Sequence, residues 1–491
     1  MGSIPAPSFR IGGPFIYLLP TRRTACTAAK QDLAEHDKTG DIMSITKQGI
    51  PVFAGTADDA EDSVYRKVTW RLLPFLGVLW VLAWLDRVNI GFAKLQMLDA
   101  LHFSEAVYGL GAGIFFLGYF FFEVPSNMLL QKIGAKKTIM RITICWGVIC
   151  MLQTFVTTPT QFYILRFLLG AFEAGFYPGV ILYLTYWYPS QRRARAFGTF
   201  MSASAIAGVL GGPLAGWIMT SMAGVNGMHG WQWLFILEGI PSVLAGIFAW
   251  FYMTDKPEQA RWLSDDEKRV LQDALKRDNA ALGERGHDWR TLFANPKVWL
   301  LIAIFFCLLC ANSTLTFWIP TIIKDVGFTT PMAVGWIAAV AYLCGAAGMI
   351  LNGAHSDRRN EVRWHFSGAA LVGGGAMAVL AVLLGAQVLS PVIALLAMTA
   401  ALVGTMSAIP VFWQLPNRYL AGSAAAVGVA LINSVANLAG FGAPYVMGLI
   451  KNTTGKLTSG LYLVAVIEVL AAALVLVGIR KLGGKHGKQG A

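Results

Sequence analysis

The chain has 491 residues, of which 56% are hydrophobic and only 13% are charged. Soluble domains contain about 45–50% apolar and about 25% charged residues, so this composition excludes a disordered chain and most soluble enzymes. The formal net charge of +12 does not require a nucleic-acid partner, because Lys and Arg gather in the cytoplasmic loops of membrane proteins.

Residues 1–65 differ from the rest of the chain, because they are polar, mixed in charge and rich in Gly, Pro and Thr. We expect a disordered cytoplasmic tail. An over-long gene start is the alternative, with Met43 as the first residue of a shorter protein.

Long charge-free segments predict membrane spans. Residues 196–237 and 366–417 contain no Asp, Glu, Lys or Arg, and about twenty apolar residues suffice for a helix to cross the bilayer. The sequence therefore predicts an all-α polytopic membrane protein with twelve transmembrane helices. The predicted spans are 71–94, 106–128, 138–157, 161–187, 196–220, 232–253, 298–320, 332–354, 366–388, 391–413, 424–450 and 458–480.

Basic residues gather in the loops on one side of these spans. By the positive-inside rule this side is cytoplasmic, and with twelve spans both termini lie there. The basic residues before the C-terminal tail are Lys132, Lys136, Lys137, Arg141, Arg192, Arg193, Arg195, Arg358, Arg359, Arg363 and Arg418. The predicted location is the cell (inner) membrane.

One long loop divides the spans into two sets of six. We expect a six-helix bundle at 66–253, a cytoplasmic linker at 254–296, a second bundle at 297–480 and a cytoplasmic tail at 481–491. Ser264 and Glu267 have the spacing of a capping box, which predicts an amphipathic helix inside the linker.

The two halves contain related loops after their second spans. One loop has Gln131-Lys132-Ile-Gly134, and the other has Gly353-Ala-His-Ser-Asp357-Arg358. Both are similar to the Gly-x-x-x-Asp-Arg loop of the major facilitator superfamily, and two parallel six-helix repeats are a known transporter architecture. The resemblance implies that Lys132, Gly134, Asp357 and Arg358 act in gating loops, although Gln131 replaces the usual Asp.

Further motifs resemble the anion:cation symporter family within that superfamily, with bacterial tartrate-type (organic acid) permeases the most similar group. The resemblance runs from about 66 to 480. The motifs are Trp84-Leu-Asp86-Arg87-Val-Asn89, Gly118-Tyr119-Phe-Phe-Phe-Glu123-Val-Pro125, Arg166-Phe-Leu-Leu-Gly170-Ala-Phe-Glu173 and Trp231-Gln-Trp-Leu-Phe-Ile-Leu-Glu238-Gly239.

Few charges fall inside the predicted spans, where each costs several kcal/mol, on the order of 2.5–3.5 on insertion scales. They are Asp86, Arg87, Lys94, Glu123, Arg166, Glu173, Glu238 and Glu468. Arg87 and Arg166 suit the binding of an organic anion, because a guanidinium matches a carboxylate. Asp86 and Glu173 suit proton coupling, because buried carboxyls bind protons more readily. The resemblance implies the same roles, and the alternative is that these four residues only neutralise one another.

We interpret Glu123 as a structural residue at the cytoplasmic end of the second span, next to Pro125, and Glu238 as a structural residue early in the sixth span, beside Gly239. Tyr119 lies on a cavity-forming helix by analogy with the family, which also places substrate contacts near Ser204, Trp413 and Asn433. Asn437 lies one turn after Asn433, with interhelical hydrogen bonding as the alternative role.

The leading hypothesis is a secondary transporter that imports a small organic anion, a tartrate-like hydroxy-dicarboxylate or a sugar acid, by proton symport and alternating access. The alternative is a proton-coupled exporter of drugs, because Gly208-x-x-x-Gly212-Pro213-x-x-Gly216 partly resembles an antiporter motif. A membrane-bound enzyme or sensor is a third possibility, but no catalytic constellation occurs. We expect a monomer in contact with lipid, with no nucleic-acid partner, no cofactor and no metal.

Overall fold

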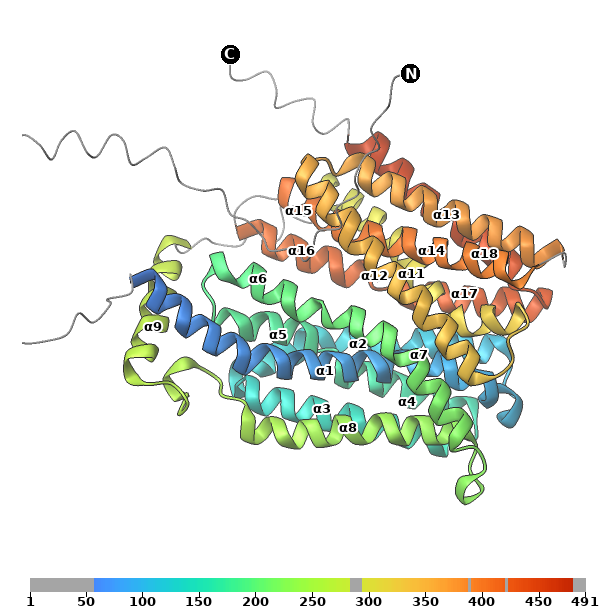
Figure 1. Ribbon diagram of the computed structural model, residues 1–491, viewed down its shortest axis with the longest axis horizontal. Coiled ribbons are helices and arrows are strands. Elements are labelled where there is room, and N and C mark those ends of the chain that lie inside the picture. The colour runs from blue at the N-terminus through green and yellow to red at the C-terminus, as the bar shows by residue number, and fades with distance from the viewer. Residues whose placement is uncertain (1–56, 283–293, 387–389, 420–422, 480–491) are drawn as a thin grey trace, which may run out of the picture. The chain divides into compact units, whose positions relative to one another are not determined.

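A computed structural model describes residues 57–282, 294–386, 390–419 and 423–479 (Figure 1). Within these residues the regular elements are helical, and twelve helical segments are long and apolar enough to cross a membrane. This confirms the prediction of an all-α protein with twelve spans. Residues 1–56 of the predicted tail and the predicted 481–491 tail lie outside the described residues.

The first six spans are formed by eight α-helices, because two of the spans are interrupted. They are α1 (Ala57–Leu101), α2 (Glu105–Ile133), α3 (Ala135–Leu152), α4 (Pro159–Glu173) with α5 (Phe176–Thr185), α6 (Ser190–Met201) with α7 (Ala203–Ser221), and α8 (Gly230–Tyr252).

The second six spans repeat this pattern of whole and interrupted helices. They are α11 (Pro296–Asp325), α12 (Pro331–Arg359), α13 (Arg363–Ala386), α14 (Pro391–Phe412) with α15 (Gln414–Tyr419), α16 (Ser423–Ala436) with α17 (Ala439–Thr454), and α18 (Thr458–Leu474), which continues into a π-helical turn at Val475–Ile479.

The start of α1 differs from the sequence prediction. The helix begins at Ala57, inside the segment expected to be a disordered tail. Ion pairs explain the extension, because Arg192 on α6 lies 2.6 Å from Asp62 and 3.6 Å from Glu61. These contacts hold the polar first turns, and the buried side chains of Val64 and Tyr65 anchor the turn that follows.

The linker contains the predicted amphipathic helix, α9 (Asp265–Leu282). The Ser264 backbone N–H donates to Glu267 at 2.8 Å, and the Glu267 N–H donates to the Ser264 hydroxyl at 3.2 Å, which confirms the capping box. Lys67 on α1 lies 2.8 Å from Glu267, and Leu271 is fully buried. We call the end of the spans at which α9 contacts α1 the α9 end, and the other end the opposite end.

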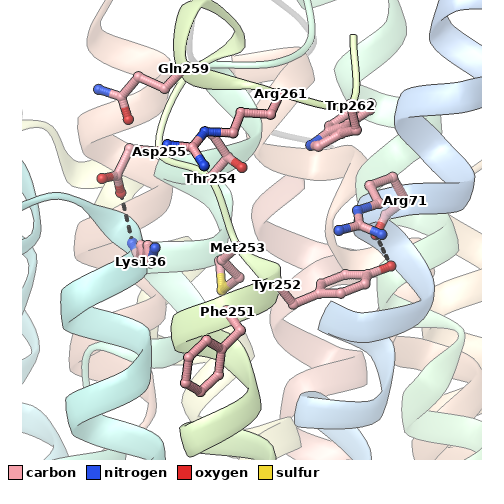
Figure 2. Close-up of a pocket in the computed structure, with 10 residues that line it drawn as sticks. All are labelled: Arg71, Lys136, Phe251, Tyr252, Met253, Thr254, Asp255, Gln259, Arg261 and Trp262. Carbon is pink, nitrogen blue, oxygen red and sulfur yellow. Dashed lines mark hydrogen bonds between the residues drawn. The ribbon is translucent and has the colours of Figure 1, made fainter.

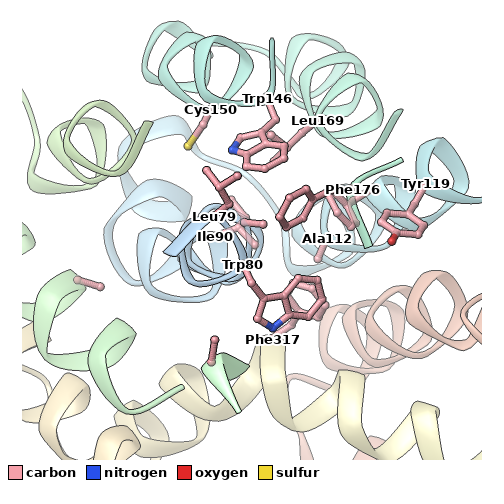
Figure 3. Packing of buried hydrophobic residues seen from close by; sticks show 14 of the residues in the cluster. Leu79, Trp80, Ile90, Ala112, Tyr119, Trp146, Cys150, Leu169, Phe176 and Phe317 are labelled. Atoms are coloured by element: carbon pink, nitrogen blue, oxygen red, sulfur yellow. The ribbon is translucent and has the colours of Figure 1, made fainter. Parts of the chain in front are cut away.

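The first half has an aromatic core around the middle of α1. The rings of Trp146 and Phe176 meet edge to face at 5.3 Å, and Trp80 stacks on Phe176 at 6.3 Å. Figure 3 shows these three rings together beside Leu79 and Ile90 of α1. Such large buried rings contribute strongly to core stability, so this core holds α1 firmly against α3 and α5.

The two halves touch through α2 with α17, α7 with α12, and α1 with α11. Glycines allow two of these contacts, because a Cβ on Gly109 would lie 2.5 Å from the Pro444 carbonyl oxygen. A Cβ on Gly212 would lie 2.4 Å from the Gly335 carbonyl oxygen. Small residues let transmembrane helices approach this closely, so the halves are tightly packed here, toward the opposite end.

Candidate functional site

Four spans are interrupted, and the interruptions occupy matching places in the two halves. The fourth and fifth spans break after Glu173 and just before Ala203, and the tenth and eleventh break at Trp413 and after Ala436. Interrupted helices at corresponding positions of a repeat are a typical sign of a transporter binding site. Of the predicted site residues, Glu173, Ser204, Trp413 and Asn437 lie in or next to these breaks.

Arg87 of α1 and Glu173 of α4 form an ion pair between two spans. The Arg87 Nε donates to Glu173 Oε1 at 3.0 Å, and its Nη2 contacts the same oxygen. The Arg87 side chain is 14% exposed to solvent, whereas the Glu173 side chain is 2% exposed. Glu173 Oε2 is buried without a hydrogen-bond partner, so the carboxylate binds the cation through one oxygen only.

Arg166 of α4 is fully buried, and most of its guanidinium lacks a partner. Its Nε donates to the Gly111 carbonyl oxygen on α2 at 3.2 Å. Its Nη1 and Nη2 are buried with no hydrogen-bond acceptor. An unpaired buried cation is costly, and the structure leaves these two nitrogens as donors without an acceptor.

The ring of Phe115 brings the two arginines into one site. The guanidinium carbon of Arg87 lies 5.2 Å from this ring, and that of Arg166 lies 5.3 Å from it. Arg87 also lies 5.5 Å from the ring of Tyr119 and 5.9 Å from that of Trp84. Aromatic faces attract cations at these distances, and they hold both guanidiniums without neutralising them.

Asp86 is fully buried and faces a different set of helices from Arg87. Its Oδ2 accepts from Ser242 of α8 at 2.6 Å, and its Oδ1 accepts from the Cys150 thiol of α3 at 3.1 Å. Asn89 donates to Cys150 at 3.5 Å, and Glu238 is 4% exposed one turn before Ser242. Asp86 therefore has neutral partners, which does not match the alternative that all four charges only neutralise one another.

Four uncharged candidate residues lie in the fifth, tenth and eleventh spans, and their side chains make different contacts. Ser204 accepts a 2.6 Å hydrogen bond from the Trp80 indole, so its oxygen already has a partner. Trp413 packs at 4.9 Å against Phe305. Asn433 and Asn437 are half-buried and lie one turn apart in the eleventh span, where the Asn437 backbone N–H donates to the Asn433 carbonyl oxygen. The structure does not place any of these four in contact with the arginines.

Comparison with known families decides the class of the protein. Residues 76–444 match the Major Facilitator Superfamily. The chain belongs to this superfamily. Its members transport small solutes rather than catalyse reactions, so the prediction that the protein is not an enzyme is confirmed.

Curated relatives of this superfamily member cover most of its length. "Putative metabolite transport protein NicT" of Pseudomonas putida is 46% identical over 85% of this chain and 95% of its own. A "Putative tartrate transporter" of Agrobacterium vitis is 44% identical over 88% of this chain and 98% of its own. A "Quinolone resistance transporter" of Acinetobacter baumannii is 39% identical over 86% and 96%. The metabolite and tartrate transporters agree with the resemblance to organic acid permeases, whereas the quinolone resistance transporter does not.

Solved structures show the same fold at low sequence identity. A bacterial homologue of the lysosomal transporter Spinster, inward-facing and occupied, has a TM-score of 0.68, 18% identity and coverage of 85% of this chain and 97% of its own. A D-xylose–proton symporter has a TM-score of 0.68, 13% identity and coverage of 84% and 97%. The superfamily fold is therefore shown by structure as well as by sequence.

The predicted gating loops are built differently in the two halves. Gly134 has a φ of +92°, which favours glycine, and Asp255 after α8 accepts the Lys136 N–H at 2.7 Å beside it. Asp357 accepts instead from the Gln414 side chain of α15 at 2.8 Å. Lys132 and Arg358 are exposed. Asp255 thus places a carboxylate next to the loop in which Gln131 replaces Asp.

Two charged contacts between the halves were not anticipated from the sequence. Glu123 lies inside α2, which continues past Pro125 to Ile133, so the predicted helix-end position is wrong. It accepts a 3.0 Å hydrogen bond from Ser434 of α16 and therefore faces the other half. Lys94 is 4% exposed and lies 2.7 Å from Glu105 and 3.0 Å from the Thr321 hydroxyl of α11. The signal for Lys94 was its charge within a predicted span, but nothing in the sequence indicated its partners.

The Lys94 contact belongs to a larger network at the opposite end. Lys451 of α17 lies 3.1 Å from Glu105 and 3.3 Å from Asp325. The Lys94 ammonium also lies 3.7 Å from the Trp318 ring. We call Lys94, Glu105, Asp325 and Lys451 the opposite-end network. It links α1 and α2 of one half to α11 and α17 of the other.

Proposed function

We propose that this transporter imports a small organic anion, a hydroxylated mono- or dicarboxylate such as tartrate or a sugar acid, by proton symport. The observation that carries the proposal is Arg166, whose two terminal nitrogens are buried without an acceptor. A carboxylate offers two oxygens in the geometry that a guanidinium fork matches.

Arg87 is a second cation for the substrate, and protonation of Glu173 makes it available. In the empty protein its charge is taken up by Glu173. Protonation of Glu173 weakens this ion pair and frees Arg87 for a carboxylate of the substrate. Binding of the anion and of the proton then favour one another, which is the linkage that symport requires.

Asp86 supplies a separate proton site in this proposal. It is fully buried among neutral donors from Ser242 and Cys150, and no cation within the described residues forms an ion pair with it. Taking an ionised carboxylate out of water is costly, so a proton on Asp86 lowers the cost of moving α1 past α3 and α8.

The half-buried second-half residues complete the site. We assign Asn433, Asn437 and Trp413 to the uncharged part of the substrate, with Tyr119 and Ser204 on the first-half wall. The bundles 66–253 and 297–480 rock about this site. The α9 end is cytoplasmic, as the basic loops indicate, and the protein acts as a monomer in the inner membrane, with the loops of Gly134 and Asp357 in gating.

Drug export by proton antiport is the second candidate, and one observation favours it. A relative with 39% identity is a "Quinolone resistance transporter". Quinolones also carry a carboxylate that a guanidinium matches, so Arg166 fits both candidates, and transport of organic acids against efflux of a quinolone separates them.

Purified protein in proteoliposomes tests the proposal. A panel of radiolabelled organic acids is offered with an inward proton gradient, with the gradient collapsed by an ionophore, and with a quinolone in parallel. We expect gradient-driven uptake of at least one hydroxy acid, lost in Arg166→Gln and retained in Arg195→Gln, an exposed residue of α6. Uptake that is unchanged by the ionophore refutes proton coupling, and drug efflux without acid uptake favours the exporter.

A further inference from the structure

A cavity of about 560 Å³ lies at the α9 end of the first half, away from the candidate substrate site. It is open on one side and is lined by α1, the start of α3, the end of α8 and the segment 253–262. Figure 2 shows Arg71, Lys136 and Arg261 reaching it from three different segments. The cavity lining thus gathers three cations that are far apart in the sequence.

These cations lack carboxylate partners. In the described part of the chain, none of the three takes part in an ion pair. Arg71 Nε is buried without a hydrogen-bond acceptor. Asp255 also lines the cavity, but its Oδ1 accepts the Lys136 backbone N–H at 2.7 Å. The cavity therefore carries excess positive charge.

Aromatic rings lie against two of these cations, Arg71 and Lys136. The Arg71 guanidinium lies 3.8 Å from the centre of the Tyr252 ring and 5.9 Å from that of Trp262. The Lys136 ammonium lies 4.7 Å from the Trp250 ring. Trp and Tyr are enriched where a membrane protein crosses the headgroup region, so the cavity lies at the depth of lipid phosphates.

An exposed apolar strip leads from the cavity toward the middle of the spans. Phe251 lines the cavity and is 76% exposed, and Phe248 and Leu244, further along α8, are 50% and 60% exposed. These side chains are one turn apart on one face of the helix. Such a strip suits acyl chains, whereas a free phosphate ion has no use for it.

We propose that this cavity binds the phosphate of an anionic phospholipid, with its acyl chains along the exposed face of α8. Arg71, Lys136 and Arg261 contact the phosphate oxygens, and basic pockets between transmembrane helices are known to bind such headgroups. Because Asp255 joins the cavity to the loop at Gly134, the lipid also anchors the α2–α3 turn at the membrane surface.

Native mass spectrometry of the full chain in detergent tests the lipid site. Phosphatidylglycerol and phosphatidylcholine are titrated against the wild type, Arg261→Gln, Lys136→Gln and the control Arg195→Gln. We expect selective retention of phosphatidylglycerol and about fivefold weaker binding for each cavity variant, since each basic group near a membrane surface contributes about that factor. The control should bind as the wild type does.

Three results overturn the proposal. The first is equal retention of the two lipids, and the second is equal loss in Arg261→Gln and Arg195→Gln. Competition by glycerol phosphate as strong as that by the intact lipid would assign the cavity to a soluble phosphate ester and so contradict the lipid. Melting temperatures of all variants confirm that they fold, and quenching of Trp262 by brominated phosphatidylglycerol, lost in Trp262→Phe, places the lipid at the cavity.

Discussion

Replacement of Arg166 by Gln tests whether this residue binds the substrate or only stabilises the fold. In the empty protein the Arg166 side chain makes a single hydrogen bond, from Nε to the Gly111 carbonyl oxygen at 3.2 Å. Its remaining nitrogens are buried without partners. A structural arginine would be saturated with acceptors, so the two roles predict opposite effects on the stability of the empty protein.

The magnitudes follow from these contacts. Loss of the hydrogen bond to Gly111 costs about 0.5–1.5 kcal/mol, whereas removal of an unpaired buried charge relieves a desolvation penalty of several kcal/mol. Arg166→Gln should therefore leave the empty protein as stable as the wild type or more stable. Two lost charge-assisted hydrogen bonds to the anion, each about 1.5–3 kcal/mol, should weaken binding by about a hundredfold to ten-thousandfold.

Thermal melting in detergent and isothermal titration with the transported acid measure the two effects. Arg166→Lys keeps the charge but loses the fork, so it should bind with intermediate affinity. Arg195→Gln controls for the change in net charge. A lower melting temperature in Arg166→Gln combined with unchanged affinity for the acid would refute the assignment of Arg166 to the substrate.

Three further predictions concern coupling, gating and the linker helix. Asp86→Asn should bind the anion normally and exchange it across vesicles but lose accumulation driven by a proton gradient, and gradient-driven uptake equal to that of the wild type would contradict its role. Lys451→Met removes the 3.1 Å ion pair to Glu105 that joins α17 to α2, so spin labels on α2 and α17 at the opposite end should shift toward longer distances, and an unchanged distance distribution would count against the gate. Partial burial acts to raise the pKa of Glu267, but hydrogen bonds from Lys67 and Ser264 outweigh it and hold the pKa below the ordinary 4.5. The ionised carboxylate therefore stabilises α9 docking above pH 4.5 and loses this effect as pH falls through the lower pKa of the folded state, so thermal melting of Glu267→Gln should lack that acid-dependent loss.

The sequence predicted the spans and the scarce buried charges because both depend on composition along the chain. The bilayer excludes charge, so long apolar runs mark the helices, and Asp86, Arg87, Arg166 and Glu173 stand out within them. The start of α1 was missed because its polar first turns are held by Arg192. Contacts of that kind depend on packing between distant segments.

Partners across helices could not be predicted for the same reason. Asp86 and Ser242 are 156 residues apart, and no periodicity relates them. Glu123 looked like a helix-end residue because Pro125 follows closely, yet Ser434 of the other half lies 3.0 Å away. Glu468 had no assigned role, and the structure places it within the second half, where it accepts from Thr405 at 2.7 Å.

Buried charges in this transporter are paired at the opposite end, where they join the two halves, and unpaired at Arg166, where we propose that the substrate binds. At the opposite end Lys94 and Lys451 share Glu105, and Lys451 also contacts Asp325. This network must break when that end opens. At the centre Arg166 has no ion pair to break. In the proposed import, an anion that binds there gains its interaction with Arg166 without displacing a carboxylate, but it reaches the site only after the contacts of Glu105 with Lys94 and Lys451 have broken at the opposite end.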